Sequence, residues 1–437
     1  MNTAAVAMTH FGHHPDIIPR LVVPQTRNGR LDLLAERALG SYGPVVCEDV
    51  MGELKAALLR GRGGAGFPAH IKWHSVAGSA GPGPRVVVAN GEEGEPASAK
   101  DRWLLTHRPH AVLDGLLLAA AVTGADRAIV YLSHPETVGT IEESIAELRA
   151  ADLVPAGLRL DVHVVAPTYV AGEESAVCRS LNGGPALPLA KPPRPFESGV
   201  SGLPTLVSNV ETLAHAAWIA RHGAEEYGRH GTVGSPGTTL VTLSGACERP
   251  GVYEVPYGLS VQELFTGPGG GYTSPPPSGF LMGGWFGGLL SAERAEVACC
   301  YDAVRAVGSG LGCGAITALG AEDTPLAVAA DIAAWYAEES AQQCGVCVKG
   351  TAAIRDAMGN LRDGIATSAT AANLIRWGTT LPRRGACAFL DGAATLARSL
   401  ATEFPAAVSA GALAPSAESA EPTSSHSHRY SSKETTP

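Results

Sequence analysis

Five stretches of the sequence decide the fold: RVVVAN (85–90), PHAVLDGLLLAAAVTG (109–124), AIVYL (128–132), PETVGTIEESIAELRAA (135–151) and LRLDVHVV (158–165). The first, third and fifth are short apolar runs rich in valine, isoleucine and leucine, which predicts strands, whereas the second and fourth are long enough for helices. Strands that alternate with helices are typical of a parallel sheet with crossover connections. The sequence therefore predicts an α/β domain.

Further parts are predicted on both sides of this unit, since 437 residues accommodate roughly three domains. Residues 1–46 are rich in glycine, proline and polar side chains and are expected to form an irregular arm. The α/β domain spans 47–237, and short strands with glycine turns predict a small β-rich domain at 238–322. Helical periodicity returns at 323–412. Residues 413–437 have almost no large apolar side chains, which predicts a disordered tail.

The composition excludes several classes of protein. The 32 basic and 42 acidic side chains give a net charge of −10 without a Lys/Arg run, which argues against nucleic acid as a partner. The longest apolar stretch, 111–125, is interrupted by Asp114, so direct membrane insertion is not expected. The first residues lack the pattern of a secretory signal, and nine cysteines in such a chain favour metal or redox chemistry over disulfides. We therefore expect a cytoplasmic protein.

A glycine-rich loop, GRGGAGFP, follows a helix predicted near residues 47–60. Gly61, Gly63 and Gly66 fit the G-x-G-x-x-G pattern, but a Rossmann fingerprint should follow a strand rather than a helix. Backbone without Cβ atoms can closely approach a phosphate or a flat ring, and Arg62 adds positive charge. A tight connection between two elements explains the same glycines, so both interpretations stay open.

An acidic cluster follows the strand at 85–90. Asn90, Glu92, Glu93 and Glu95 lie within six residues, and ligands bind at the carboxyl ends of parallel strands. These amide and carboxylate groups can accept hydrogen bonds from ribityl or ribose hydroxyls or from a ring N–H. The alternative is a solvated acidic turn.

A second group of this kind follows the third strand, in YVAGEESA. Tyr169, Gly172, Glu173 and Glu174 lie where a strand leads into a helix. Carboxylates at a helix N-terminus are stabilised by its dipole, so capping alone would explain both glutamates. Two such junctions on neighbouring strands favour a ligand site. Later segments add Lys191, Asn209 and Thr212.

Three cysteines have the spacing of a metal or redox site. Cys344 and Cys347 form C-x-x-C, and 39 residues separate Cys347 from Cys387. Without a thioredoxin-like unit beside the motif, thiol–disulfide chemistry is less favoured. Three thiolates are one short of the four that a [4Fe–4S] cluster or a structural zinc takes. Buried core positions are expected for Cys178, Cys299, Cys300 and Cys313.

Eight motifs, taken in order along residues 47–405, resemble the family of flavin- and NADH-binding subunits of respiratory complex I, with relatives in soluble hydrogenases and formate dehydrogenases. The resemblance implies a Rossmann-like FMN domain, a ubiquitin-like β-grasp domain often called SLBB, and a C-terminal helical bundle with a [4Fe–4S] cluster. The motifs are RGRGGAGFPAHIKW, ANGEEGEPASAKDR, YVAGEESA, KPPRPF, LVSNVETLAH, YDAVRAVGSGLGCGAI, ESAQQCGVCVKG and RRGACAFLDGAA.

The resemblance also implies a site and a reaction. NADH or NADPH would transfer a hydride to FMN, and electrons would then leave singly to an iron–sulfur partner, with the cofactor carrying the chemistry. Phe67, Glu95 and Lys191 match NADH-contacting positions; we assign catalytic roles to Glu95 and Glu174, and metal binding to Cys344, Cys347 and Cys387. The implied flavin contacts are Gly61, Arg62, Gly63, Gly64, Gly66, Lys72, Asn90, Glu92, Glu93, Tyr169, Gly172, Glu173, Glu174, Asn209, Thr212 and Ala388.

Four positions depart from the family pattern. Ala341 stands where the first cluster cysteine is expected, and alanine cannot bind iron, so the cluster is either altered, for example to [3Fe–4S], or absent. Ser75 and Arg194 replace phenylalanines that stack on adenine; losing one stack costs roughly 1 to 3 kcal/mol, although an arginine can itself stack on a base or bind an added phosphate. Ser208 replaces an asparagine.

We expect an FMN-dependent NAD(P)H oxidoreductase that serves as the electron-input component of a complex and requires an iron–sulfur electron-acceptor subunit. Two alternatives stay open. A ferredoxin-like partner, rather than a nicotinamide, could be the source of electrons, or the chain could be a non-catalytic structural subunit.

Overall fold

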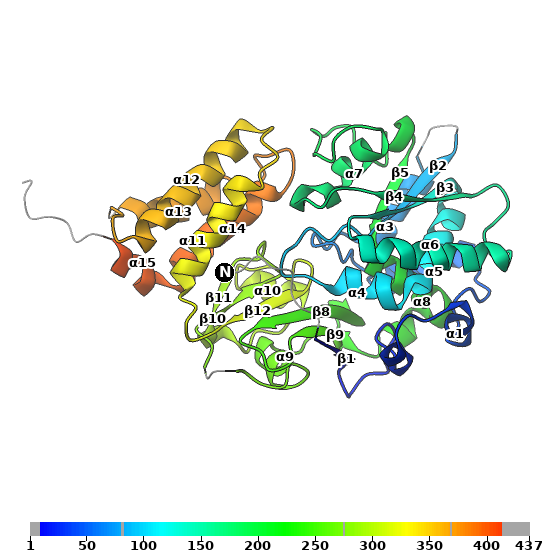
Figure 1. The fold of residues 1–437 in the computed structure, drawn as a ribbon, viewed down its shortest axis with the longest axis horizontal. Helices are drawn as coiled ribbons and strands as arrows, with labels where there is room; N and C mark the ends of the chain where they lie inside the picture. The colour runs from blue at the N-terminus through cyan, green and yellow to red at the C-terminus, as the bar shows by residue number, and fades with distance from the viewer. Residues whose placement is uncertain (1–8, 80–82, 274–275, 368, 413–437) are drawn as a thin grey trace, which may run out of the picture.

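The computed structural model describes residues 9–79, 83–273, 276–367 and 369–412, which fold into two sheet-containing parts and a group of helices (Figure 1). The first part contains a four-stranded sheet in the order β4-β3-β2-β5, and all of its strand pairs are parallel. The predicted parallel α/β sheet is therefore confirmed. Its strands are β2 (Arg85–Asn90), β3 (Ala125–Leu132), β4 (Arg159–Val164) and β5 (Thr205–Asn209).

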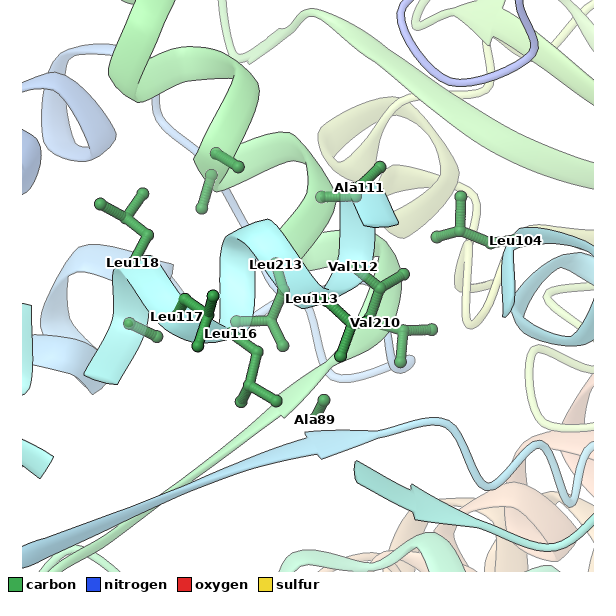
Figure 2. Close-up of a cluster of buried hydrophobic side chains, with 14 of the residues drawn as sticks. Ala89, Leu104, Ala111, Val112, Leu113, Leu116, Leu117, Leu118, Val210 and Leu213 are labelled. Carbon is green, nitrogen blue, oxygen red and sulfur yellow. The ribbon is translucent and has the colours of Figure 1, made fainter. Parts of the chain in front are cut away.

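One face of this sheet is covered by α5 (Pro109–Thr123) and α8 (Val210–Tyr227), beside α6 (Pro135–Ala150). Figure 2 shows Ala89 of β2 beneath the apolar side chains of α5 and α8. The two helices approach so closely that a Cβ at Gly115 would lie 2.1 Å from the carbonyl oxygen of Leu213. Glycine is required there because any side chain would push the helices apart.

The other face packs against α7 (Glu174–Leu181), whose Val177 and Cys178 contact the valines of β2.

Two elements of this part have too weak a hydrophobic pattern to be predicted from the sequence. The strand β5 falls between a turn-rich segment and the next predicted helix, because TLVSN is short and half polar. The helix α4 (Lys100–His107) has a charged first turn, and its apolar residues are consecutive rather than periodic.

The second part contains a six-stranded mixed sheet in the order β1-β9-β8-β12-β10-β11. The predicted strands TTLVTLSG and GVYEVP are β8 (Thr238–Gly245) and β9 (Gly251–Pro256). The predicted helix is α9 (Val261–Thr266), which begins with a capping box formed by Ser260 and Glu263. Its other strands and second helix are β1 (His10–His13), β10 (Gly279–Met282), β11 (Leu289–Ser291), β12 (Ala315–Leu319) and α10 (Tyr301–Ala306).

The expected irregular N-terminal arm contains regular elements within residues 9–46: β1, a 3-10 turn (Pro24–Asn28) and a short helix (Leu33–Ala38). The strand β1 pairs in parallel with β9. The fully buried Glu254 carboxylate of β9 accepts hydrogen bonds from the backbone N–H groups of Arg20, Leu21 and Val22 at 2.8 to 3.1 Å. The sequence HFGH lacks apolar alternation, so its pairing depends on the neighbouring strand and could not be read from its own residues.

The C-terminal region is helical, as predicted, and lies beside the two sheets (Figure 1). None of the helices in the described parts of the chain has both the length and the apolar character that a membrane crossing requires. The predicted disordered tail, 413–437, lies outside the described residues. The helices are α11 (Pro325–Glu338), α12 (Gly345–Arg362), α13 (Ala369–Thr380), α14 (Phe389–Glu403) and α15 (Pro405–Gly411).

The remaining elements are short or lie before β2. They are the helices α1 (Leu33–Ala38), α2 (Cys47–Ala56) and α3 (Ala69–Ala77), the 3-10 turns Pro24–Asn28, Tyr169–Gly172, Val200–Gly202 and Ala292–Arg294, and the two-residue strands β6 (Gly231–Thr232) and β7 (Ser235–Pro236).

Candidate functional site

The predicted polar residues converge at the carboxyl edge of the parallel sheet. The Asn90 side chain, at the end of β2, donates a hydrogen bond from Nδ2 to the carbonyl oxygen of Gly172 at 2.8 Å. A Cβ at Gly172 would lie 2.6 Å from Oε2 of Glu92. The junctions after β2 and β4 are therefore in contact, and glycine is needed at 172 to let the Glu92 carboxylate approach.

The glycine loop lies against the N-terminus of α8 and against the second sheet. Backbone N–H of Arg62 donates to Oγ1 of Thr212 at 2.9 Å, and a Cβ at Gly63 would lie 3.4 Å from Cβ of Asn209. Gly66 has a φ of +61°, and a Cβ there would lie 2.8 Å from the Tyr301 ring. The loop is thus a tight connection, and it is also a backbone cradle beside a helix N-terminus, where phosphates bind.

The Arg62 side chain does not face this cradle. Its guanidinium is buried, donates from Nη2 to the Tyr227 hydroxyl at 2.9 Å and to the Thr238 carbonyl at 3.2 Å, and lies 4.8 Å from the centre of the Tyr257 ring. Its positive charge therefore joins the loop to the second sheet, and only its backbone is available to the cradle.

A cluster of two lysines and two glutamates lies at the end of β4. Nζ of Lys72 lies 3.0 Å from Oε2 of Glu174, and Nζ of Lys191 lies 3.3 Å from Oε1 of Glu174 and 2.5 Å from Oε1 of Glu173. Glu173 also caps α7, accepting from the backbone N–H of Ser175. Capping is thus correct for Glu173 but not for Glu174. Burial acts to raise the pKa of Glu174, but the two lysines outweigh it and hold the pKa below its usual value.

The acidic cluster after β2 is not a solvated turn. The Glu93 carboxylate is 3% exposed and accepts from the hydroxyl of Ser98 and the backbone N–H groups of Asp101 and Arg102, so it caps α4. The Glu92 side chain is also buried, and its Oε1 has no hydrogen-bond partner. Burial, with the neighbouring Glu93, raises the pKa of Glu92 to about 8. Glu92 therefore holds a proton at neutral pH.

Glu95 connects the two sheets. Its Oε1 accepts from the backbone N–H of Trp285 at 3.0 Å, and the Tyr169 hydroxyl donates to its Oε2 at 3.4 Å. Burial raises the pKa of Glu95 to about 7, although these donors favour the charged form. Glu95 can therefore gain or lose a proton near neutral pH.

Aromatic side chains join this site to the C-terminal helices. The ring of Tyr169 lies edge-on to Trp335 at 4.9 Å and to Phe389 at 5.4 Å between centroids. Trp335 in turn lies 4.8 Å from Trp285. Phe389 is two residues from Cys387, so the cysteine segments pack directly behind the strand-end residues.

The three predicted metal-binding cysteines lie in one core region with Ala341. Cys344 is the N-cap of α12, and Cys347 is in the first turn of that helix. Backbone N–H of Ala386 donates to Sγ of Cys344 at 3.5 Å, which brings the C-x-x-C segment against Cys387. Cys178, Cys299 and Cys300 are buried as expected, Cys313 is partly buried, and all nine cysteines are free.

The remaining predicted positions lie at the periphery of the strand-end site. Phe67 is 51% exposed beside the loop, and Ala388 is exposed at the N-terminus of α14. Ser75 lines a cavity of about 560 Å³ together with Phe196 and Glu197, while backbone N–H of Arg194 donates to Oε2 of Glu197 at 2.7 Å.

Residues 54–218 match the family of the Nuo51 FMN-binding domain, and residues 327–411 match the iron–sulfur binding region of NADH-ubiquinone oxidoreductase F. An F-type subunit of the NADH-quinone oxidoreductase of Rhizobium meliloti is 34% identical over 327 residues, 72% of this chain and 76% of the relative. The F-type subunit of Mycobacterium tuberculosis is 33% identical over 363 residues, 80% of this chain and 81% of the relative. The chain belongs to the family of NADH-quinone oxidoreductase F-type subunits.

A solved structure is also similar. The NAD+-reducing [NiFe]-hydrogenase in its H2-reduced state matches this F-type chain with a TM-score of 0.77 and 31% identity. The match covers 84% of this chain and 63% of the hydrogenase chain. Because the match covers so much of this chain, the likeness extends over most of the fold.

The strand-end residues of this F-type chain fit a flavin mononucleotide. The loop offers backbone rather than side chains to a phosphate, because a Cβ at Gly63 or Gly66 would meet Asn209 or Tyr301. A buried carboxyl oxygen of Glu92 has no partner within the protein. Such an orphaned polar atom at a strand end calls for a ligand.

The cysteine region does not fit a four-thiolate cluster. Only three thiols are present, and Ala341 packs in the apolar core. Among the residues that the structure describes, no three His, Cys, Asp or Glu side chains are arranged to hold a metal ion. The likeness to the iron–sulfur binding region is therefore a likeness of sequence over residues 327–411, with three cysteines in the segment.

The buried charges beneath the loop are not evident from sequence patterns. Lys100, Asp101 and Glu211 are all less than 6% exposed and lie between the loop and the second sheet. The one signal for them is their position inside the motifs ANGEEGEPASAKDR and LVSNVETLAH. Charges of this kind are usually surface residues, because burial of a charge is costly unless it is paired.

Proposed function

We propose that this chain is the electron-input component of an NADH-oxidising complex. In this proposal it binds FMN and a nicotinamide, and passes electrons to an iron–sulfur partner subunit. The observation that carries the proposal is the convergence of the glycine loop, the residues after β2 and the residues after β4 at one edge of the sheet, in a chain 33–34% identical to F-type subunits over most of its length.

FMN would be held by backbone and by polar side chains from four segments. The loop 61–66 and the N-terminus of α8, with Asn209 and Thr212, would receive the phosphate. Asn90 and the protonated Glu92 would face the ring and the ribityl chain. When bound, FMN supplies the ability to accept two electrons together and release them one at a time. Lys72, Gly172 and the residues from Tyr169 to Glu174 would close the site.

The nicotinamide would lie beside Phe67, Glu95 and Lys191. Phe67 is exposed next to the loop, where its ring can pack on a flat ligand. Glu95 and Glu174 are the carboxylates that we assign to catalysis. Glu174 is ionised between two lysines and can orient a polar ligand, whereas Glu95, with a pKa of about 7, can hold or release a proton at the site.

The domain division belongs to the same proposal. We assign the FMN and NADH domain to 47–237, a β-grasp domain of the SLBB type to 238–322, and an iron–sulfur-type helical domain to 323–412. One face of the second sheet supports this division, because its side chains form a cluster of their own with α9. Other side chains of that sheet, such as Leu281 and Leu319, pack in the same cluster as α11–α14.

The cluster in this chain is altered or lost in our proposal, because Cys344, Cys347 and Cys387 supply only three thiolates. The next electron carrier would then be an iron–sulfur subunit or a ferredoxin. We also propose that the protein is cytoplasmic, in keeping with nine free thiols, and that nucleic acid is not among its partners.

Anaerobic flavin reduction tests the function. The purified chain is reconstituted with FMN, and bleaching of the flavin absorption is followed after addition of NADH, NADPH or a reduced ferredoxin. We expect bleaching by a nicotinamide. Bleaching by ferredoxin alone would favour the alternative donor, and failure to bind FMN would leave only a structural role. Iron and acid-labile sulfide content, measured on the same sample, separates an incomplete cluster from none.

A further inference from the structure

Four charged side chains are buried together beneath the glycine loop. Nζ of Lys100 lies 2.6 Å from Oδ1 of Asp101 and 2.9 Å from Oε2 of Glu211. Nε of Arg62 lies 3.9 Å from Oε1 of Glu211. Lys100 is 1% exposed and Glu211 is completely buried. Burial of two cations and two anions is tolerable only because each charge is paired.

The Lys100 ammonium reaches the loop through Asp101. The second carboxylate oxygen of Asp101, Oδ2, accepts from Nδ2 of Asn209 at 2.7 Å. Asn209 caps α8, where its Oδ1 accepts from backbone N–H of Glu211 at 3.0 Å. The same side chain lies against Gly63. Asp101 therefore fixes both the α8 N-terminus and the surface on which the loop rests.

Glu211 also connects Lys100 to the second sheet and to the loop. Its carboxylate accepts from backbone N–H of Leu240 at 2.9 Å and from Oγ1 of Thr239 at 3.2 Å, both in β8 of the second sheet. It also faces Arg62, the loop residue whose backbone N–H donates to Thr212. Lys100 thus stands where the helix α4, the helix α8, the loop and the second sheet meet.

We propose that Lys100 is a positioning residue for the cofactor loop. Its ammonium pairs with Asp101 and Glu211. These two carboxylates in turn place Asn209 and Arg62, which hold the loop in the shape that binds FMN. This inference rests on the proposed flavin site. The groups that face Lys100 are Asp101 and Glu93 near its own helix, Glu211 of α8 and the thiol of Cys313. Glu211 itself also faces Arg62 of the loop and His215 of α8.

A purely structural role for the ammonium would change the stability of the protein but not the pH dependence of its FMN affinity. If Lys100 acts through two carboxylates, its removal leaves two buried anions with too little positive charge. Such groups take up a proton, because burial disfavours their charged form. FMN affinity in the variant should then depend on pH, and neutralising one carboxylate should restore it.

The test compares FMN dissociation constants of the full chain, measured by quenching of flavin fluorescence from mildly acidic to mildly alkaline pH. We expect Lys100→Met to weaken FMN binding by about tenfold or more at alkaline pH and to recover as the pH falls. The double variant K100M/E211Q should bind within about threefold of the wild type. Lys55→Met, which removes an exposed lysine of α2, is the matched control.

An affinity of K100M equal to that of the wild type at every pH would overturn the inference, as would a loss that K100M/E211Q does not restore. If K100M does not fold, Asp101→Asn removes the negative charge and one of the two carboxylate oxygens through which Asp101 joins Lys100 to Asn209. A dissociation constant of that variant within about twofold of the wild type would also overturn it. Failure of the wild type to bind FMN contradicts the proposed function instead, so the two failures are distinguishable.

Discussion

The strand-end site and the cysteine segment differ in how completely their ligand-binding groups are present. At the strand ends, the loop glycines, Asn90 and the Lys72–Glu174 pair are all present, and each is held by a contact: Gly63 with Asn209, Asn90 with Gly172, and Lys72 with Glu174. In the cysteine segment, three thiols lie in one core region with Ala341, and the described residues form no metal site.

The strand-end site is complete and the cysteine segment is not, and the structural roles of the side chains explain this difference. Glu93 caps α4, Glu173 caps α7 and Arg62 joins the loop to the second sheet, so replacing any of them would damage the fold as well as the site. An alanine in the place of a thiol packs in an apolar core at little cost. A polar site that is also structural is therefore harder to lose than a ligand whose only partner is a metal.

The largest expected effect comes from breaking the strand-end site at Gly66. Gly66→Val places a branched side chain at a φ of +61°, with its Cβ 2.8 Å from the Tyr301 ring. We expect FMN affinity to fall by at least about tenfold, and the free energy of unfolding to fall by about 2 kcal/mol. Titration with FMN and thermal unfolding measure both.

The control for Gly66 is Gly52→Ala in α2, where a Cβ would meet nothing within 4 Å. That change should leave FMN binding intact and raise stability by about 0.5 to 1 kcal/mol. Unchanged FMN affinity in Gly66→Val would show that the loop does not form the flavin cradle.

The next effect concerns the addition of a fourth thiol to the cysteine segment. Ala341→Cys supplies a fourth thiol, so we expect iron content to rise toward about four per chain, with matching labile sulfide. FMN affinity should not change. Adding Cys344→Ser to this variant should remove the iron again. Iron content equal to that of the wild type in Ala341→Cys would mean that position 341 does not face a cluster site.

A smaller effect is expected from the proton on Glu92. The pKa of Glu92 is raised to about 8 in the folded protein, so the folded state binds this proton more tightly than the unfolded state. The contribution is therefore favourable at low pH and is lost as the pH rises from about 4.5, the ordinary pKa of a glutamate, toward 8. Glu92→Gln should flatten this part of the stability profile. Chemical unfolding at several pH values measures it, and an equally steep profile in the variant would contradict the assignment.

Hydrophobic periodicity predicts those helices and strands whose own residues form a long or regular apolar pattern. The strands β2 and β3 and the helices α5 and α6 are evident because their apolar runs are long or regular. The strand β1 is not, because HFGH has no alternation and depends on β9, and β5 is not, because TLVSN is short and half polar.

Proximity cannot be read from the sequence, so the partners of the site residues come only with the structure. The motif around Lys100 is visible in the sequence, but its contact with Glu211, 111 positions later, depends on how α4 and α8 pack. In the same way, the composition of the loop suggests that the charge of Arg62 is available to a phosphate. The guanidinium is buried among Tyr227, Thr238 and Tyr257 instead.

The smallest expected effect is a change in stability at two neighbouring glutamines of the cysteine segment. Gln342 is exposed and has a φ of +53°, a conformation that L side chains rarely adopt. Gln342→Gly removes this strain, and we expect stability to rise by less than about 1 kcal/mol, because glycine also loses more chain entropy on folding.

The neighbouring Gln343 is the matched contrast. Its side chain accepts from Nη1 of Arg179 at 2.9 Å and donates to the carbonyl oxygen of Pro188 at 2.8 Å, which ties the C-x-x-C segment to the α/β part. Gln343→Gly should lower stability by about 1 kcal/mol, opposite in sign to Gln342→Gly. Denaturant unfolding of the two variants resolves this difference in sign. If both changes lower stability equally, relief of strain at Gln342 does not distinguish the two positions.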